Sequence, residues 1–162
     1  MILVAIGSNL AGAGHASPRA VCEAALAALD AAGLRVVRRS RWYRTAPVPV
    51  SDQPWFVNGV ARLETGLDPA TVLDILHGIE SRFGRARVAV NEARVLDLDL
   101  LAHGDHVRAE RPVLPHPRLH LRAFVLLPLA EVAPGWRHPL DGRTVEAMIA
   151  SLPPGQQAVP EA

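Results

Sequence analysis

Two carboxylates stand two residues apart within an apolar run. Residues 96–101 read LDLDLL, so Asp97 and Asp99 are surrounded by leucines. If this segment is a strand, both carboxylates fall on one face and the alternating leucines on the other. Neighbouring carboxylates repel each other, and a divalent cation would relieve the repulsion, with Mg²⁺ suiting their hard oxygen atoms. The spacing therefore predicts a magnesium site, although an isolated D-x-D pattern is also typical of an ordinary solvated strand face.

Arginines flank the carboxylate pair on both sides in the sequence. They are Arg85, Arg87, Arg94, Arg118 and Arg122, with His116 and His120 beside the last two. A metal held by carboxylates bridges phosphate oxygens, and guanidinium forks neutralise the charge of a transferring phosphoryl group. Such a transfer needs no protein nucleophile, so this set of groups favours a reaction on a polyphosphate.

The charge of the whole chain is nearly balanced. Its 17 basic residues are all arginine, and 16 acidic residues leave a formal net charge of +1. That balance argues against a general polyanion binder, including a nucleic-acid binder. Residues 82–94 and 108–122 each hold four arginines against one glutamate. The sequence therefore predicts one localised polyanion site.

Other features of the composition narrow the class of protein. A length of 162 residues and an apolar fraction of 49% suit one globular domain over 1–162. The lone Cys22 excludes an internal disulfide and a cysteine-based zinc site. No apolar run approaches the ~20 residues that span a bilayer, and no signal peptide is recognisable. We expect a cytoplasmic protein without a membrane partner.

The elements that must position the carboxylates follow from hydrophobic patterning. Strands are predicted over 2–6, 34–43, 55–65 and 95–102, and helices over 18–32 and from Asp68 to Gly84. In the strand 55–65, Phe56 and Asn58 share a face opposite Trp55 and Val57. The order βαββαβ predicts a ferredoxin-like α+β fold, with an antiparallel sheet and helices packed on it.

The remainder of the chain is expected to be a loop-rich extension. Residues 121–127 are predicted to be helical, and Pro128 to start a separate short turn. Thr144 is a predicted N-cap for a last helix that ends near Leu152. The tail 153–162 is predicted to be frayed.

Short motifs along nearly the whole chain, to about Pro134, make it similar to a known family. They are residues 7–10 (GSNL), 43–47 (YRTAP), 52–54 (DQP) with Asn58, 63–65 (LET), Glu80 with 84–87 (GRAR), Arg94 with 96–100 (LDLDL), 115–117 (PHP), 122–124 (RAF) and 128–131 (PLAE). In this order and spacing the sequence resembles the 6-hydroxymethyl-7,8-dihydropterin pyrophosphokinases of the folate pathway.

The resemblance implies that pyrophosphate passes from ATP to the pterin hydroxymethyl group and leaves AMP, with two Mg²⁺ ions. Asp97 and Asp99 would hold both ions, and Asp97 would also help to orient the hydroxyl nucleophile. By the same resemblance, Arg85 and Arg94 would grip the phosphates, with Arg87 nearby. The expected partners are therefore the small-molecule substrates, and a monomer is expected.

The resemblance also assigns residues to the two substrates. Positions that match nucleotide contacts are Glu80, Arg85, Arg87, Arg94, Leu100, His116 and Arg122. Positions that match the pterin pocket are Thr45, Ala46, Val48, Phe56, Asn58 and Phe124. Asn58 can both donate to and accept from a pteridine edge, and Phe56 and Phe124 offer faces on which a flat heterocycle stacks.

One motif departs from the family pattern. Where the family has Trp-Gly-Pro-Arg before the carboxylate strand, this chain has NEAR at residues 91–94, in a loop about one residue shorter. Closure of such a loop excludes water from the site. We therefore predict an active enzyme whose lid closes differently. The alternatives are a weakly active or inactive relative that binds pterin or nucleotide, and a non-enzymatic ferredoxin-like interaction module.

Overall fold

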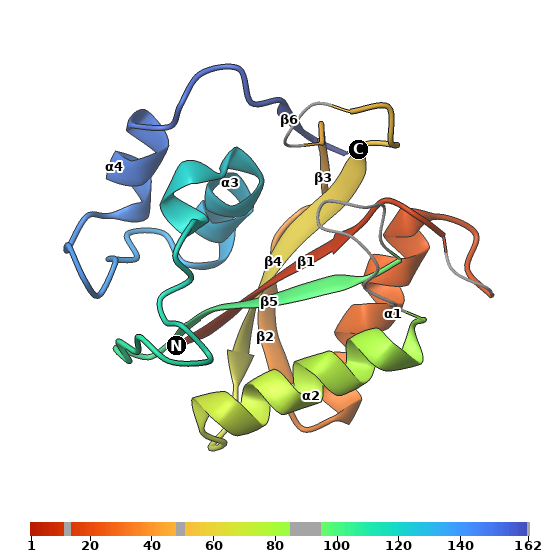
Figure 1. Ribbon diagram of the computed structural model, residues 1–162, viewed down its shortest axis with the longest axis horizontal. Coiled ribbons are helices and arrows are strands. Elements are labelled where there is room, and N and C mark those ends of the chain that lie inside the picture. The colour runs from red at the N-terminus through yellow and green to blue at the C-terminus, as the bar shows by residue number, and fades with distance from the viewer. Residues whose placement is uncertain (12–13, 48–50, 85–94, 162) are drawn as a thin grey trace.

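A computed structural model describes residues 1–11, 14–47, 51–84 and 95–161, which form one six-stranded antiparallel sheet with helices on both faces (Figure 1). The elements are β1 (Ile2–Ser8), α1 (Pro18–Ala31), β2 (Arg35–Arg39), β3 (Tyr43–Thr45), β4 (Phe56–Glu64), α2 (Pro69–Arg82), β5 (Asp97–His103), the 3-10 turn η1 (Leu119–Leu121), α3 (Ala123–Val132), α4 (Val145–Ala150) and β6 (Ala158–Pro160). The strand order is β5-β1-β4-β3-β6, with β2 also paired to β4. This arrangement confirms the predicted α+β, ferredoxin-like fold.

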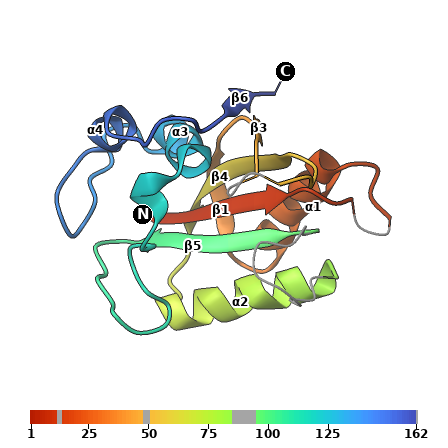
Figure 2. The same cartoon turned by 45° about the horizontal axis from the view of Figure 1, so that its top comes forward.

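The two faces of the sheet carry separate apolar cores. Helices α1 and α2 cover one face, and α3 and α4 cover the other (Figure 2). We call the core under α1 and α2 the first core and the core under α3 and α4 the second core. Because side chains alternate along a strand, Val4 and Ile6 of β1 lie in the first core while Leu3 lies in the second. The lone Cys22 lies in the first core, as its Ala-rich helical surroundings predict.

The helices near the site begin and end at local signals. The Ser17 hydroxyl accepts a hydrogen bond from the Ala20 N–H, and Pro18 occupies the first helical position of α1. Gly33 and Gly84, just beyond α1 and α2, have φ of +87° and +88°, which favours glycine. None of the helices in the part of the chain that the structure describes is long and apolar enough to cross a membrane.

The predicted strand over 34–43 is wrong, because the structure has two strands there. Ser40 interrupts them, since its hydroxyl donates to the Arg41 carbonyl at 2.7 Å and accepts from the Val60 N–H at 3.0 Å. Trp42 then lies over Gly59, where a Cβ would come within 2.6 Å of the indole. The contacts of the Ser40 and Trp42 side chains therefore divide into two strands a segment whose residue types would favour one continuous strand.

The prediction that Pro128 begins a new turn is also wrong. Helix α3 continues through Pro128 to Val132, although proline removes one backbone hydrogen bond. Leu126, Leu129 and Val132 are fully buried in the second core. Burial of this apolar helix outweighs the local cost of proline.

The tail, which was predicted to be frayed, pairs with the sheet over Ala158–Pro160. Strand β6 pairs antiparallel with β3, and Thr45 faces Ala158 in the register. The Glu161 N–H donates to the Trp42 carbonyl at 2.8 Å, and the Glu161 carboxylate pairs with Arg19 at 3.0 Å. Thr144 caps α4 as predicted, but the helix ends at Ala150.

Candidate active site

The carboxylate pair lies on one face of β5. Asp97 and Asp99 are half-buried on the side of α3, where they face Gly7 and Ala5 of β1 in the register. Leu98 and Leu100 point into the opposite core. The predicted alternation is confirmed, and it places both carboxylates toward the same space.

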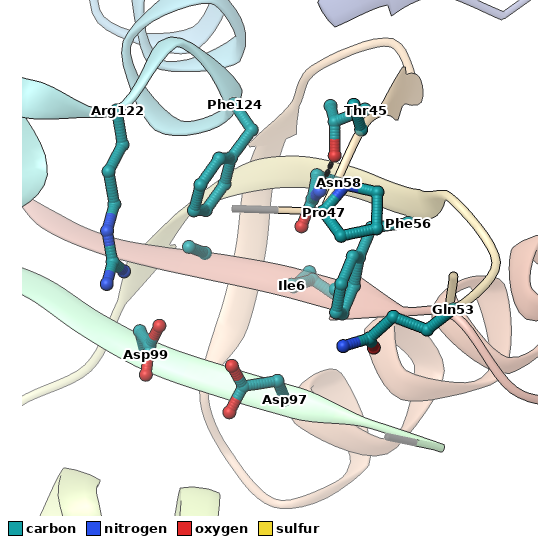
Figure 3. Close-up of a pocket in the computed structure, with 13 residues that line it drawn as sticks. Ile6, Thr45, Pro47, Gln53, Phe56, Asn58, Asp97, Asp99, Arg122 and Phe124 are labelled. Atoms are coloured by element: carbon teal, nitrogen blue, oxygen red, sulfur yellow. Dashed lines mark hydrogen bonds between the residues drawn. The ribbon is translucent and has the colours of Figure 1, made fainter. Parts of the chain in front are cut away.

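That space is a pocket whose walls come from four strands and the start of α3 (Figure 3). The lining residues are Ala5, Ile6, Gly7, Thr45, Ala46, Pro47, Gln53, Phe56, Asn58, Asp97, Asp99, Arg122 and Phe124. The fold thus brings together both predicted metal ligands, the predicted nucleotide contact Arg122, and five of the six positions expected to hold the pterin.

One polar side chain in the pocket is held in a defined position. Asn58 is buried, and its Nδ2 donates to Thr45 Oγ1 at 2.6 Å (Figure 3). Gly7 lies opposite Asn58 in the register, and a Cβ at Gly7 would come within 2.5 Å of Asn58 Oδ1. The absence of a side chain at Gly7 therefore makes room for the Asn58 amide.

The pocket has an aromatic end and a charged end. Phe56 and Phe124 lie near Asn58, while the Arg122 guanidinium points toward the Asp99 carboxylate (Figure 3). The Arg122 guanidinium also lies 5.3 Å from the centre of the Phe124 ring, within the range of a cation–π contact. The arrangement can hold a flat heterocycle at one end and an anionic, metal-bound group at the other.

Three predicted nucleotide contacts lie outside the pocket lining. Glu80 is buried on α2, where its Oε2 accepts from the Leu98 N–H at 2.8 Å. Leu100 is buried in the core beneath β5. His116 donates its main-chain N–H to the Leu101 carbonyl at 2.9 Å. Their roles toward a nucleotide stay predictions, and Arg85, Arg87, Arg94 and Val48 lie outside the described residues.

His116 is held neutral beside the charged end. Burial lowers its pKa to about 4, and the positive charges of Arg122 and Arg118 act in the same direction, against the charge of Asp97. Nδ1 of His116 accepts from the Arg118 N–H at 3.2 Å. A neutral imidazole therefore carries its proton on Nε2.

The sequence alone did not reveal a contact between the residue that follows β1 and the loop that precedes β4. Asn9 is buried, and its Nδ2 donates to Gln53 Oε1 at 2.8 Å and to the Pro54 carbonyl at 3.1 Å. Gln53 in turn lines the pocket. The signal was present in the GSNL and DQP motifs, but nothing in the sequence shows that these two segments meet.

The donor set of the charged end fits Mg²⁺. Among the residues that the structure describes, no group of three or more His, Cys, Asp or Glu side chains gathers in a way that could hold a metal. Magnesium is usually bound through one or two carboxylates and keeps its other positions for water and substrate phosphates. Asp97 and Asp99 match that pattern, whereas a closed structural metal site would need more protein ligands.

Comparison with known proteins points to one family. The family described as 7,8-dihydro-6-hydroxymethylpterin-pyrophosphokinase (HPPK) matches residues 3–134. A relative from Pseudomonas aeruginosa named 2-amino-4-hydroxy-6-hydroxymethyldihydropteridine pyrophosphokinase is 43% identical over 154 residues, which cover 94% of this chain and 91% of the relative. A Methylorubrum extorquens protein of the same name is 45% identical over 75% of this chain and 77% of its own length. The folic acid synthesis protein fol1 of Pneumocystis carinii is 33% identical over 74% of this chain, but over only 16% of its own length.

Proposed function

Because the chain belongs to the 7,8-dihydro-6-hydroxymethylpterin-pyrophosphokinase family, we propose that it moves pyrophosphate from ATP to 6-hydroxymethyl-7,8-dihydropterin, with Mg²⁺. The enzyme class, a pyrophosphokinase of folate synthesis, follows from the family. We propose in addition that ATP is the pyrophosphate donor, that Mg²⁺ is the metal, and that the individual residues have the roles given below. One observation carries it: a single pocket joins an aromatic end with a fixed amide to a charged end with paired carboxylates.

The aromatic end would hold the pterin. The rings of Phe56 and Phe124 can contact the faces of a heterocycle, and the Asn58 amide can bond to its edge. The hydrogen bond to Thr45 restricts rotation of that amide, so less ordering is needed when the substrate binds. Thr45 and Ala46 would close the same side of the pocket.

The charged end would hold the triphosphate. Asp97 and Asp99 would hold two Mg²⁺ ions, which would offset the charge of the transferring group. Arg122 would pair with phosphate oxygens through its guanidinium fork. Glu80, Leu100 and His116 stay proposed nucleotide contacts by family position, as do Arg85, Arg87 and Arg94 for the phosphates and Val48 for the pterin.

The reaction would be an in-line displacement at the β-phosphorus. The pterin hydroxymethyl oxygen forms a bond to that phosphorus, the bond to the oxygen that bridges the α- and β-phosphorus atoms breaks, and AMP keeps this oxygen. The Asp97 carboxylate would accept the hydrogen bond of the attacking hydroxyl and so direct its lone pair, and the hydroxyl proton would be released to solvent as the new bond forms. Beyond this the protein mainly positions the reactants and stabilises charge.

The test measures AMP release from ATP, Mg²⁺ and the hydroxymethyl-dihydropterin. We expect AMP in the wild type, and a loss of at least about 100-fold in Asp97→Asn and in Asp99→Asn, since each removes a charge that binds the metal. Asp105→Asn, in the exposed turn after β5, is the matched control and should keep full activity. Binding of both ligands without AMP would instead identify a binding-only relative, and full turnover in either site variant would refute the metal assignment.

We further propose that the enzyme works as a monomer in the cytoplasm, where its donor ATP is available. Light scattering of the purified protein at assay concentration tests it, and a dimer mass would contradict it.

A further inference from the structure

One side chain from the C-terminal segment holds the backbone on both sides of Arg122. Gln156 Oε1 accepts from the Ala123 N–H at 2.8 Å, and Gln156 Nε2 donates to the Leu121 carbonyl at 2.8 Å. These two groups belong to the peptide units that flank Arg122. A single primary amide therefore restrains both peptide planes that set the direction of the Arg122 side chain.

Arg122 does not use its own side chain to cap the helix that begins after it. It is the N-cap residue of α3, and its side chain makes no capping hydrogen bond. The first N–H groups of a helix have no acceptor within the helix, and here Gln156 supplies the acceptor for the first of them. Both Arg122 and Phe124, one residue into α3, line the pocket.

The residues that follow Gln156 hold the opposite wall. The Gln157 carbonyl accepts from the Ala46 N–H at 3.1 Å, and Ala158 pairs with Thr45. In Figure 1, the segment from α4 passes above α3 before β6 joins β3. A second cavity lies along this segment, lined by Gln156 and Gln157 and sharing Ala46, Pro47 and Phe124 with the pocket. The tail thus joins the two walls between which the substrates would lie.

We propose that Gln156 is a positioning residue, which directs Arg122 toward the phosphates and Phe124 toward the pterin. The inference rests on the proposed function, because the orientation of Arg122 and Phe124 affects activity only if the substrates bind between these walls. Displacement of a positioning group by about 1 Å costs up to ~100-fold in rate. One of the two hydrogen bonds is part-buried and the other exposed, so their loss should weaken folding only modestly and leave a folded protein in which kcat/KM can be measured.

The first test compares Gln156→Ala with Gln157→Ala. The two glutamines are neighbours, but Gln157 contributes only its main-chain carbonyl to the contacts described above. We expect kcat/KM for ATP to fall about 10-fold or more in Gln156→Ala and to stay within about two-fold in Gln157→Ala. Equal effects of the two variants on kcat/KM would overturn the proposal. Urea unfolding verifies that both variants are folded.

A double-mutant cycle with Arg122→Ala separates positioning from general damage. If Gln156 acts through Arg122, then Gln156→Ala should lower kcat/KM for ATP by less than two-fold once Arg122 is absent. A full additional loss in the double variant would refute action through Arg122.

Gln156→Glu adds a pH readout that a merely structural role would not produce. A glutamate can still accept from Ala123, but it can donate to the Leu121 carbonyl only when protonated. Its activity relative to wild type should therefore rise as the pH falls toward the carboxyl pKa, and a flat ratio would contradict the proposal.

Direct titration with MgATP keeps the inference separate from the proposed function. If the wild type releases no AMP, the proposed activity fails, and MgATP affinity then decides whether Gln156 matters. Weaker MgATP binding in Gln156→Ala than in Gln157→Ala supports the positioning role, and equal affinities refute it.

Discussion

The fold keeps the imidazole of His116, beside the charged end, neutral. Burial lowers the pKa of His116 to about 4, and the positive charges of Arg122 and Arg118 add to this effect against the charge of Asp97. The imidazole is therefore neutral at physiological pH and adds no positive charge near Asp97. Among the described residues of the pocket lining, Arg122 is the cationic side chain at this end that can attract phosphate.

The depressed pKa of His116 predicts a pH dependence of stability. The unfolded chain takes up this proton near pH 6.5 and the folded chain only near pH 4, so the unfolded state binds more protons in between. The free energy of unfolding should therefore fall as the pH falls from 6.5 toward 4. His116→Gln lacks this contribution, and between pH 7 and pH 5 it should lose on the order of 1 kcal/mol less than wild type, after allowance for solvent screening. Urea unfolding at both pH values measures the difference, and equal losses would contradict the assignment.

At the scale of elements, the pairing of β1 with β4 builds the aromatic end of the pocket. The register sets Gly7 beside Asn58, and β3 then sets Thr45 within reach of the same amide. A side chain at Gly7 would occupy the space of Asn58 Oδ1. The pocket therefore depends on a strand position that lacks a side chain.

Gly7→Ala should displace the Asn58 amide. The new Cβ would lie 2.5 Å from Asn58 Oδ1, and overpacking of this kind costs about 1–3 kcal/mol of unfolding free energy. We expect weaker pterin binding in calorimetry and a smaller change in MgATP binding. Gly66→Ala is the control, because a Cβ there meets nothing within 4 Å. Pterin affinity equal to wild type in Gly7→Ala would refute the role given to Asn58.

Helix α2 supports the strand that carries the carboxylates. Strand β5 is at the edge of the sheet, and the Leu98 N–H between Asp97 and Asp99 bonds to the buried Glu80 carboxylate. This hydrogen bond fixes the position of the strand segment that carries both carboxylates relative to α2. Glu80 thus has a structural role in addition to its proposed contact with nucleotide.

Replacement of Glu80 tests this support. Glu80→Ala leaves the buried Leu98 N–H without its acceptor, which costs about 1–3 kcal/mol of unfolding free energy. Glu80→Gln keeps an acceptor oxygen and should recover most of the loss in chemical denaturation. If both variants were equally unstable, the negative charge rather than the hydrogen bond would be the important feature.

In the whole molecule, the site lies over the second core and is supported by the first. Leu76 of α2 belongs to the core beneath β5, while Leu126 of α3 belongs to the core behind Phe124. Glu131 joins α3 to the sheet, because it accepts from the Tyr43 hydroxyl and from the Arg41 N–H. Both layers are therefore needed to hold the pocket walls.

Cavities in either core should destabilise the whole molecule. Leu76→Ala and Leu126→Ala each remove a fully buried side chain and should cost about 2–5 kcal/mol in thermal or urea unfolding. Leu140→Ala, at a side chain that is 66% exposed, should cost less than about 0.5 kcal/mol. A small loss in Leu126→Ala alone would show that the layer of α3 and α4 packs loosely on the sheet.

Local signals in the sequence were sufficient for most of the fold. Ser17 and Pro18 start α1, Gly33 and Gly84 follow the ends of α1 and α2, and alternation put Asp97 and Asp99 on one face. These features depend on residues close in the chain, whose geometry is set by backbone and side-chain sterics. The family motifs also pointed to Asp97, Asp99, Arg122 and five pterin positions that line one pocket in the structure.

Only the tertiary structure decided how distant segments meet. The split of the predicted strand at Ser40, the passage of α3 through Pro128 and the pairing of β6 with β3 all run against local expectation. Each follows from contacts with residues far away in the chain, whose burial and hydrogen bonds outweigh local propensity. The two hydrogen bonds of Gln156 to the peptide groups around Arg122 also depend on residues that are distant in the chain. A sequence records residue types, but it does not show which backbone groups a distant side chain will contact.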